Sequence, residues 1–562
     1  MITESTVDGV PVLLAHQPGP VTAGLLFRVG RADETLATSG ITRLVRRLAL
    51  HRLGPGDPSG EDGSAPASTF TLFRITGSPA EVAAHLNGVC AALRDLPVEG
   101  LETAKEILRT APADRSPDHL GRSAQWRYGS RSHGLTGYAE VGLPHLTAEQ
   151  VRDWARTRFT TGNAVLWITG DTVPEGLDLA LPAGGRHPAP EPASALPALP
   201  ARFPGDAGSV TLTSVLPRST AASLLTGVLG RELLRELHQD GGYAYTATAR
   251  YLPRDARSAT VVAHAEALPQ HHEAMAGAFA DVLAKLRAGR VDPSALEAVR
   301  ASALARLDAP GLAAARLPDR AADLLLGRPH RTVAEERAEI EAVGAEELHE
   351  VARALWAAAL LRAPRGSMDG AGLAAAPTGS AQGVAGRAHP ALDDPGTVLT
   401  VGTEGVGLAG PAGRITVRYA ECSLVQAYPD GARHLVGHDG FTLTVEPTRF
   451  GITAAELAPL DAGVPPSVVL AMPPRTPARV PRTAPTTTAP APAPWFTVLL
   501  WVLGLPGLII GASTLFLGLV MGDEHGRIAS DNAWFLFRWL LVAGASLIPW
   551  AICLRLRNSG RK

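Results

Sequence analysis

Apolar and polar positions recur with clear periods over the first 360 or so residues of the chain. Between residues 39 and 52 the apolar side chains return every three or four positions, so that Ile41, Leu44 and Leu48 fall on one helical face. Short apolar runs beside turn residues are typical of strands. These patterns predict strands over 10–14, 21–29, 69–75 and 163–169, and helices over 39–52, 80–93, 98–109 and 148–159.

A similar order of elements returns in the next part of the chain. The same patterns predict strands over 209–215, 244–250 and 258–263, and helices over 221–238, 269–288, 293–307, 312–326 and 345–358. Two units in which strands and helices follow one another in related order favour a duplicated α+β fold, with a sheet and its helices sandwiched in each unit. The predicted units span residues 1–181 and 205–363.

Three segments lack a periodic apolar pattern. Residues 182–204 are rich in Pro and Ala, 364–395 in Gly and Ala, and 473–494 in Pro and Thr, so each is predicted to be a linker. Between the last two, residues 396–472 form short β-type runs separated by Asp-Gly turns. This stretch is predicted to be a small β-rich module, for which a PH-like fold is an analogy only.

The C-terminal tail has a different pattern. Residues 495–521 contain no charge, and residues 534–554 contain only Arg538 near their start, so both runs are long enough to cross a bilayer as helices. Arginine and lysine flank the outer ends of the pair, whereas the loop between the runs has one arginine and three acidic residues. By the positive-inside rule, we expect a two-span protein of the cell membrane with its large N-terminal part in the cytoplasm.

The amino-acid composition argues against nucleic acid as a partner and against cysteine-based metal binding. The chain has 52 basic and 54 acidic residues and a formal charge of −2, so no overall positive field would draw it onto nucleic acid. Its three cysteines, Cys90, Cys422 and Cys553, are far apart in the sequence and indicate neither a disulfide framework nor a cysteine metal site.

Several short motifs in a fixed order resemble those of the insulinase, pitrilysin and mitochondrial-processing-peptidase family of zinc metallopeptidases. In the first unit they are the runs at 8–14, 28–30 and 39–42 and the closing runs 146–150 and 163–171; in the second unit they are 233–237 and 242–245. The resemblance covers residues 1 to about 360. It implies two duplicated units of the insulinase-like (LuxS- and processing-peptidase-like) metallohydrolase type, followed by the β-rich module and the C-terminal transmembrane hairpin.

The family's zinc chemistry depends on residue types that this sequence lacks. Its H-x-x-E-H motif places two histidine ligands one helical turn apart, with the glutamate as general base. By resemblance, Arg43 and Arg47 occupy the histidine positions and Arg46 occupies the glutamate position. A guanidinium stays protonated and offers zinc no lone pair. We therefore expect no zinc, no other cofactor, and a degenerate, non-catalytic family member.

The family's third zinc ligand is a glutamate on a later helix. By resemblance its position falls on Arg109 or Thr110, but Glu102 and Glu106 lie close enough to leave a metal role open for either. The densest group of other possible ligands, at 271–273 (HHE), is expected to be a solvated helix end, because adjacent side chains on a helix point about 100° apart.

The resemblance also supplies candidate binding residues. In the family, an arginine and a tyrosine of the second unit hold the substrate peptide, and by resemblance these are Arg235 and Tyr245. The alternative is that both residues only pack or face solvent. The arginines of the displaced motif either face solvent, which we expect, or form a receptor for an acidic peptide. Burial without partners would cost too much, so this helix face must be wet or paired.

These inferences favour a membrane-tethered, non-catalytic scaffold or peptide-binding subunit. The resemblance implies a peptide or protein partner, with an active family peptidase as one such partner. Two other readings stay open. One is an active zinc metallopeptidase with unrecognised ligands, and the other is a membrane-associated signalling adaptor whose peptidase-like part serves only as a packing scaffold.

Overall fold

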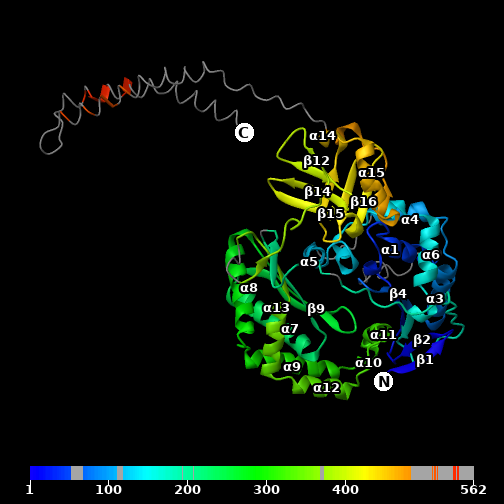
Figure 1. The fold of residues 1–562 in the computed structure, drawn as a ribbon. Helices are drawn as coiled ribbons and strands as arrows, with labels where there is room; N and C mark the ends of the chain where they lie inside the picture. Colours follow the sequence, from blue (N-terminus) through cyan, green and yellow to red (C-terminus); the bar gives the residue numbers. More distant parts are fainter. Residues whose placement is uncertain are drawn as a thin grey trace. The chain divides into compact units, whose positions relative to one another are not determined.

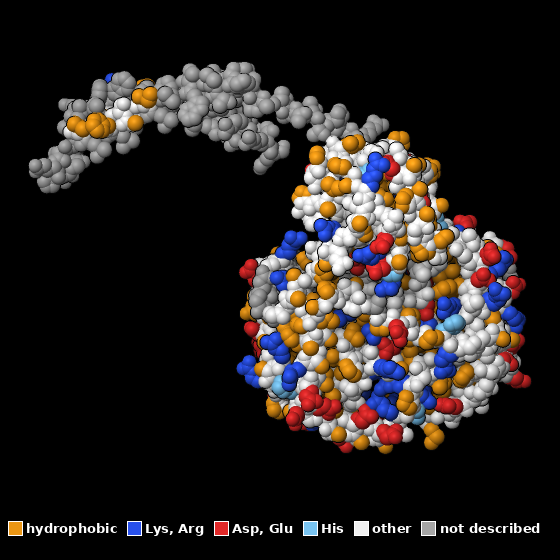
Figure 2. Space-filling model, in the orientation of Figure 1, with side chains coloured by type: hydrophobic (Ala, Val, Ile, Leu, Met, Phe, Trp, Pro, Cys, Tyr) orange, Lys and Arg blue, Asp and Glu red, His pale blue; other side chains and the backbone are white. Residues whose placement is uncertain are grey.

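The computed structural model describes residues 1–51, 53, 68–110, 118–192, 194–206, 208–366, 372–481 and scattered residues between 509 and 542. The chain divides into two compact units, Met1–Arg482 and Thr483–Lys562. Figure 1 shows the sheets and helices of the first unit. On the face drawn in Figure 2, acidic and basic side chains of that unit are interspersed, in keeping with the near-zero net charge.

The first half of this unit is built on a sheet with the strand order β1-β2-β5-β3-β4. Its strands are β1 (Thr3–Val7), β2 (Val10–Leu14), β3 (Val21–Phe27), β4 (Thr71–Gly77) and β5 (Ala164–Ile168). Strands β2 and β5 are parallel, and the other pairs are antiparallel. One face packs on α1 (Ile41–Leu50), α3 (Pro79–Arg94), α4 (Leu101–Thr110) and α6 (Ala148–Arg158). The rings of Phe27, Phe73 and Phe159 meet edge to face in this core.

The second half repeats the arrangement on a sheet with the order β11-β6-β10-β7-β9-β8. Its strands are β6 (Ala201–Pro204), β7 (Ser209–Pro217), β8 (Ala244–Pro253), β9 (Ser258–Ala267), β10 (Ala359–Ala363) and β11 (Ala374–Ala375). Its helices are α7 (Thr220–Leu233), which continues as a π-helix over Leu234–Asp240, then α8 (His272–Arg287), α9 (Pro293–Leu307), α12 (Val333–Ala342) and α13 (Ala345–Ala357).

The pairing pattern demonstrates the duplication that the sequence predicts. In the first half β2 runs parallel to β5, β5 antiparallel to β3, and β3 antiparallel to β4. In the second half β6 runs parallel to β10, β10 antiparallel to β7, and β7 antiparallel to β9. A helix follows the third of these strands in each half, so α1 and α7 are topological equivalents, as are α4 and α9.

Each half also lends a helix to the other half's sheet. Helix α11 (Leu317–Leu325), preceded by the short α10 (Leu312–Ala315), places Leu317 and Leu325 against Trp167 on the free face of the first sheet. Helix α5 (Asp118–Tyr128) packs on the second sheet, where Trp126 stacks on Phe203 with ring centroids 5.1 Å apart. This exchange joins the halves through buried apolar surface.

Residues 387–471 form the β-rich module. Two sheets share one core, with the orders β12-β13-β14-β15 and β18-β17-β16-β19. The strands are β12 (Arg387–Pro390), β13 (Val398–Val401), β14 (Gly405–Gly410), β15 (Gly413–Arg418), β16 (Cys422–Ala427), β17 (Arg433–Gly437), β18 (Thr442–Val445) and β19 (Val469–Ala471). The helices are α14 (Pro447–Phe450) and α15 (Ala454–Gly463), and α15 packs against the core.

The module is anchored on the loop that follows α5. The Ser130 backbone N–H donates to the His438 carbonyl (3.2 Å), and the Ser130 hydroxyl contacts the Ser423 hydroxyl at 2.6 Å. Gly129 has a φ of +69°, and a Cβ at this position would lie 2.0 Å from the His438 carbonyl oxygen. The approach therefore requires glycine.

The element predictions fail in identifiable places. Strand β6 lies inside the predicted linker 182–204, and β11 and β12 lie inside the predicted linker 364–395. Helices α5 and α12 and strand β10 have no counterpart among the predicted elements.

The predicted membrane spans, 495–521 and 534–554, fall almost entirely outside the described residues. Within the part of the chain that is described, no helix is long and apolar enough to cross a bilayer.

Candidate functional site

The three arginines that the resemblance assigns to the zinc-motif positions lie on α1 and are half-buried. Arg43 forms an ion pair with Glu140, and its Nη2 also donates to the Leu108 carbonyl on α4 (3.0 Å). Glu140 lies 3.5 Å from Arg31 Nη1 through its other oxygen. The side chains of this triad are only 12–14% exposed. A buried carboxylate is thus shared by two guanidiniums where the resemblance places a zinc ligand.

The expectation that this helix face turns to solvent is wrong. Arg46 Nε donates to the Leu72 carbonyl on β4 (3.1 Å), and Arg47, also half-buried, has interactions within the protein. Burial of Arg43 and Arg46 is tolerated because both find acceptors inside the first half. These contacts also use hydrogen-bonding groups that an acidic peptide would need. They therefore weaken the hypothesis that the arginines form a receptor for such a peptide.

A buried carboxyl holds the start of α1. Glu34 accepts hydrogen bonds from the backbone N–H groups of Gly40 (2.8 Å) and Thr42 (3.0 Å). Burial raises the pKa of Glu34 to about 7, although these two hydrogen bonds oppose the shift; the nearby Glu140 carboxylate adds to it. Neither Glu34 nor Glu140 stands out in the sequence, because each acts through contacts that only the fold creates.

The carboxylates of α4 are engaged on their own helix. Glu102 accepts from Lys105 Nζ (2.7 Å) and is 80% exposed, and Glu106 accepts from Arg109 Nε (2.9 Å). The Thr110 hydroxyl donates to the backbone of the preceding turn. Among the described residues, no group of three or more His, Cys, Asp or Glu side chains is arranged to hold a metal ion.

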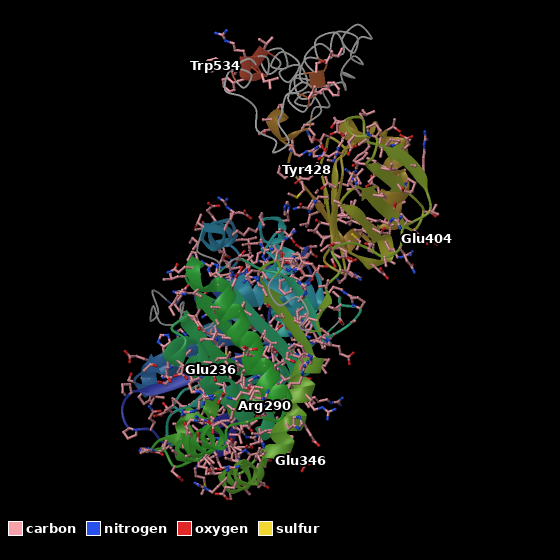
Figure 3. All side chains as sticks on the ribbon, turned by 90° about the vertical axis from the view of Figure 1, so that its left-hand side faces the viewer. Glu236, Arg290, Glu346, Glu404, Tyr428 and Trp534 are labelled. Atoms are coloured by element: carbon pink, nitrogen blue, oxygen red, sulfur yellow. The ribbon has the colours of Figure 1, made fainter. Side chains whose placement is uncertain are left out.

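Arg235 lies in an acidic cluster of the second half. Its guanidinium donates to Glu232 (2.8 Å), Glu236 (3.0 Å) and Asp292 (3.2 Å), and Lys285 Nζ also reaches Glu232, at 2.7 Å. Glu236 is labelled in Figure 3. The hydrogen bond that Arg235 donates to Glu236 is the largest of the effects that raise the pKa of Arg235. This arginine is occupied by neighbouring carboxylates, which leaves it little freedom to hold a peptide.

Tyr245 lies in a different environment, at a β-bulge. The register of β8 against β9 shifts between Ala244 and Thr246, and Tyr245 is the extra residue. Its side chain is 61% exposed, and a hydrogen bond with Glu266 raises its pKa. Because β8 has β9 as its one strand neighbour in the described part of the chain, Tyr245 marks the edge of the second sheet.

The β-rich module packs against the loop that leads into α1. Leu36 and Leu135 of the first half share an apolar cluster with Leu424, Val436 and Leu470 of the module. Leu36 lies in the loop that leads into α1. The triad around Glu140 is therefore enclosed by contacts from the first half and lies beside a buried module contact.

The chain is similar to known proteins in part of its sequence and in its fold. Residues 145–303 match the family model described as the peptidase M16 inactive domain. No curated protein has significant sequence similarity to the chain.

Solved structures share the fold. A protease from Helicobacter pylori is 16% identical, with a TM-score of 0.53 over 65% of this chain and 100% of that one. A peptidase M16 inactive domain from Pseudomonas fluorescens is 15% identical, with a TM-score of 0.52 over 66% of this chain and 99% of that one. The first half of the periplasmic protease PqqL from Escherichia coli is 14% identical, with a TM-score of 0.50 over 65% and 91%.

These similarities differ in what they cover. The structural matches establish the fold, whereas the family model begins at residue 145 and so does not include α1. The family model therefore says nothing of the positions that the resemblance assigns to the zinc motif.

Proposed function

We propose that the chain is a degenerate, non-catalytic member of the M16, insulinase-type peptidase family that binds a peptide or protein partner, as its match to the inactive-domain model and its fold support. The observation that carries the proposal is the ion pair of Arg43 with Glu140. A cation already fixed by a buried carboxylate stands where zinc would need a neutral imidazole, so this position can neither ligate a metal nor activate water.

The free edge of β8 is the proposed peptide-binding feature. An extended peptide can add to a sheet edge through main-chain hydrogen bonds, while side chains along the edge select the sequence. Tyr245 projects from this edge with 61% of its surface exposed. In the first sheet the edge strand is β4, the equivalent of β9, and it is less accessible because Arg46 already donates to its Leu72 carbonyl.

Two measurements on the full chain in detergent test the proposal. Metal analysis should find no stoichiometric zinc, and random twelve-residue peptides selected on the chain should bind without being cleaved. Tyr245→Ala should weaken those peptides about tenfold, in the range of an interface aromatic, while Arg290→Gln on the outer surface should not. Stoichiometric zinc with chelator-sensitive cleavage would overturn the non-catalytic assignment.

The tail supports membrane attachment as part of the same proposal. Residues 495–521 are uncharged, and the described residues Ile509, Phe516 and Val520 within them each expose more than half of their apolar surface. We therefore propose that the tail anchors the first unit at the cytoplasmic face of the membrane. A chain ending at residue 482 should leave the membrane fraction, whereas the full chain should resist carbonate extraction.

The second candidate ligand, besides a peptide, is a partner protein. An active family peptidase is one such partner. The β-rich module favours the adaptor alternative, because it has a core of its own. Co-purification separates the two. A partner whose capture is lost with Tyr245→Ala uses the sheet edge, whereas one that is captured unchanged uses another surface and supports the adaptor.

A further inference from the structure

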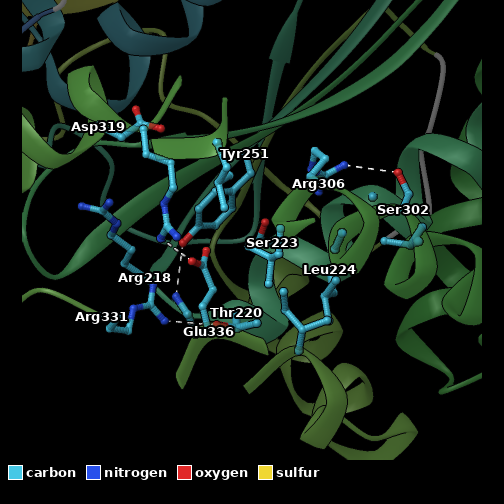
Figure 4. A pocket seen from close by; sticks show the side chains of 18 of the residues that line it. Arg218, Thr220, Ser223, Leu224, Tyr251, Ser302, Arg306, Asp319, Arg331 and Glu336 are labelled. Carbon is cyan, nitrogen blue, oxygen red and sulfur yellow. Dashed lines mark hydrogen bonds and ion pairs between the residues drawn. The ribbon is translucent and has the colours of Figure 1, made fainter. Parts of the chain in front are cut away.

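Strand β8 presents an arginine on the same edge that the proposed function assigns to a peptide. Arg250 lies within this strand, and its neighbours Ala249 and Tyr251 pack against the core of the second half. Figure 4 shows Tyr251 in a pocket beside α7 and α9, where its hydroxyl accepts a hydrogen bond from the Ser219 N–H (3.2 Å). Because side chains alternate across a strand, Arg250 projects from the opposite face of the sheet, and it is exposed.

The surroundings of Arg250 contain no carboxylate that would neutralise it. Its cross-strand and diagonal neighbours on β9 are Val262, Thr260 and His264. The acidic residue of the turn that follows β8, Asp255, pairs with Arg254 at 3.0 Å. Among the residues that the structure describes, Arg250 therefore forms no ion pair, and its guanidinium is available to a ligand.

A second arginine lies along the same row of the sheet. On its other side Val262 pairs with Thr213 of β7, whose carbonyl accepts a hydrogen bond from Arg127 Nη2 (2.8 Å). Arg127 is 6% exposed and also donates to the Ala358 carbonyl (3.0 Å), so within the described part of the chain its acceptors are carbonyls and not carboxylates. Two strand spacings, about 10 Å, separate Thr213 from Arg250. Both guanidiniums make this row of the sheet positive.

A carboxylate lies toward the other end of the edge. Glu266 is opposite Thr246, beside the bulge at Tyr245, and its Oε1 lies 3.2 Å from His264 Nε2. A hydrogen bond also joins Glu266 to Tyr245. From Thr246 to Arg250 the strand advances four residues, about 14 Å. The edge is therefore polar along its length, with an aromatic ring and a carboxylate at one end and a guanidinium at the other.

We propose that the edge of β8 selects an extended peptide that places an acidic side chain opposite Arg250 and an aromatic or large apolar side chain near Tyr245. This inference rests on the proposed function, because it specifies the peptide that adds to the same strand. Opposite charges across a ladder stabilise the pairing and like charges weaken it, so the acidic side chain belongs at the Arg250 end and away from Glu266. The two peptide residues would be four positions apart, on one face of the added strand, in whichever direction the peptide runs.

Selection of random twelve-residue peptides on the full chain in detergent tests this preference. Compared with the unselected library, the selected peptides should be enriched in Asp or Glu four positions from an aromatic or large apolar residue. In the tightest binder, Gln in place of that acidic residue should weaken binding about threefold, in the range of one cross-strand charge pair, and Lys should weaken it further. Absence of any enrichment in acidic residues would overturn the proposal.

Arg250→Glu is the decisive variant, because it should reverse the preference. The lysine form of the peptide should then bind about threefold more tightly than the acidic form. Arg290→Glu, a matched charge reversal at an exposed arginine labelled in Figure 3, should leave the preference unchanged. The melting temperature of Arg250→Glu should equal that of the unaltered chain, since the side chain is exposed.

Tyr245→Ala separates a failure of this inference from a failure of the proposed function. If Tyr245→Ala weakens the selected peptides but Arg250→Glu leaves their charge preference unchanged, the edge binds peptides and the acidic preference is wrong. If Tyr245→Ala has no effect, or if no peptide is selected, the edge is not the binding site and both proposals fail.

Discussion

At the scale of single residues, Glu34 gives the first half a pH-dependent stability. Its pKa is about 7 in the folded protein against an ordinary value of 4.5, so between these values the folded protein binds a proton that the unfolded chain does not. The resulting stabilisation is complete below pH 4.5 and is lost as the pH rises through 7. The shift corresponds to about 3 kcal/mol.

Denaturant unfolding of the full chain and of Glu34→Gln between pH 5 and 8 measures this effect. The unaltered protein should lose about 2 kcal/mol more than the variant over that range, because glutamine keeps an acceptor for the N–H groups of α1 without titrating. Glu81, an exposed helix-capping carboxyl with a lowered pKa, offers a control in Glu81→Gln. Parallel pH profiles for Glu34→Gln and the unaltered chain would contradict the assignment.

Arg28 and Asp33 form a fully buried ion pair whose members depend on each other. The Arg28 side chain is 1% exposed and that of Asp33 is 4% exposed, and Arg28 Nη1 donates to Asp33 Oδ2 at 3.0 Å. Arg28→Met should cost about 3–5 kcal/mol of unfolding free energy, because it leaves the Asp33 charge buried. Adding Asp33→Ala should recover part of that loss, as a double-mutant cycle would show. Additive losses would mean that the pair is not coupled.

These residues show where the sequence stops being informative. The substitutions at Arg43, Arg46 and Arg47 can be recognised from motif spacing alone. Their environment cannot, since Glu140 is 97 positions from Arg43 in the chain. The expectation that the arginines of α1 face solvent was therefore wrong. Only the folded structure shows that Glu140 is the partner of Arg43.

At the scale of helices and strands, short sequence signals predict the elements that contacts between nearby residues stabilise. The capping box of Thr147 and Gln150 predicts the start of α6, and both of its hydrogen bonds form. Helix α12 escapes prediction because Ile340 is its one buried residue among those described, so it has no apolar stripe to reveal it. Strand β6 escapes because four residues beside a Pro-rich segment become a strand only by pairing with β10.

The face of α1 gives a prediction at this scale. Arg43→Ala should destabilise the protein by about 2–4 kcal/mol, because it leaves Glu140 buried with only the longer contact to Arg31. Arg156→Ala on α6, where the side chain is 72% exposed, should cost less than about 0.5 kcal/mol. Chemical denaturation of both variants decides between a buried and a solvated face. Equal, small losses would restore the solvated one.

At the scale of the molecule, the duplication explains why the two halves diverge. Helices α1 and α7 follow equivalent strands, yet Arg43 of α1 pairs with the buried Glu140, whereas α7 forms one wall of a pocket. The space beside α1 is thus filled by a buried ion pair, whereas a pocket lies beside the equivalent helix of the second half. The sequence indicates the repeat but not this difference, which depends on contacts among helices far apart in the chain.

The exchanged helices should make the two halves unfold together. Leu317 on α11 is completely buried against the first sheet although it belongs to the second half. Leu317→Ala should cost about 2–5 kcal/mol by removing buried methyl groups. Hydrogen exchange of the full chain in detergent should then accelerate in peptides from both β5 and β7, because loss of the shared cluster lowers the stability of one cooperative unit. Faster exchange confined to α11 and the second half would show instead that each half is held by its own core.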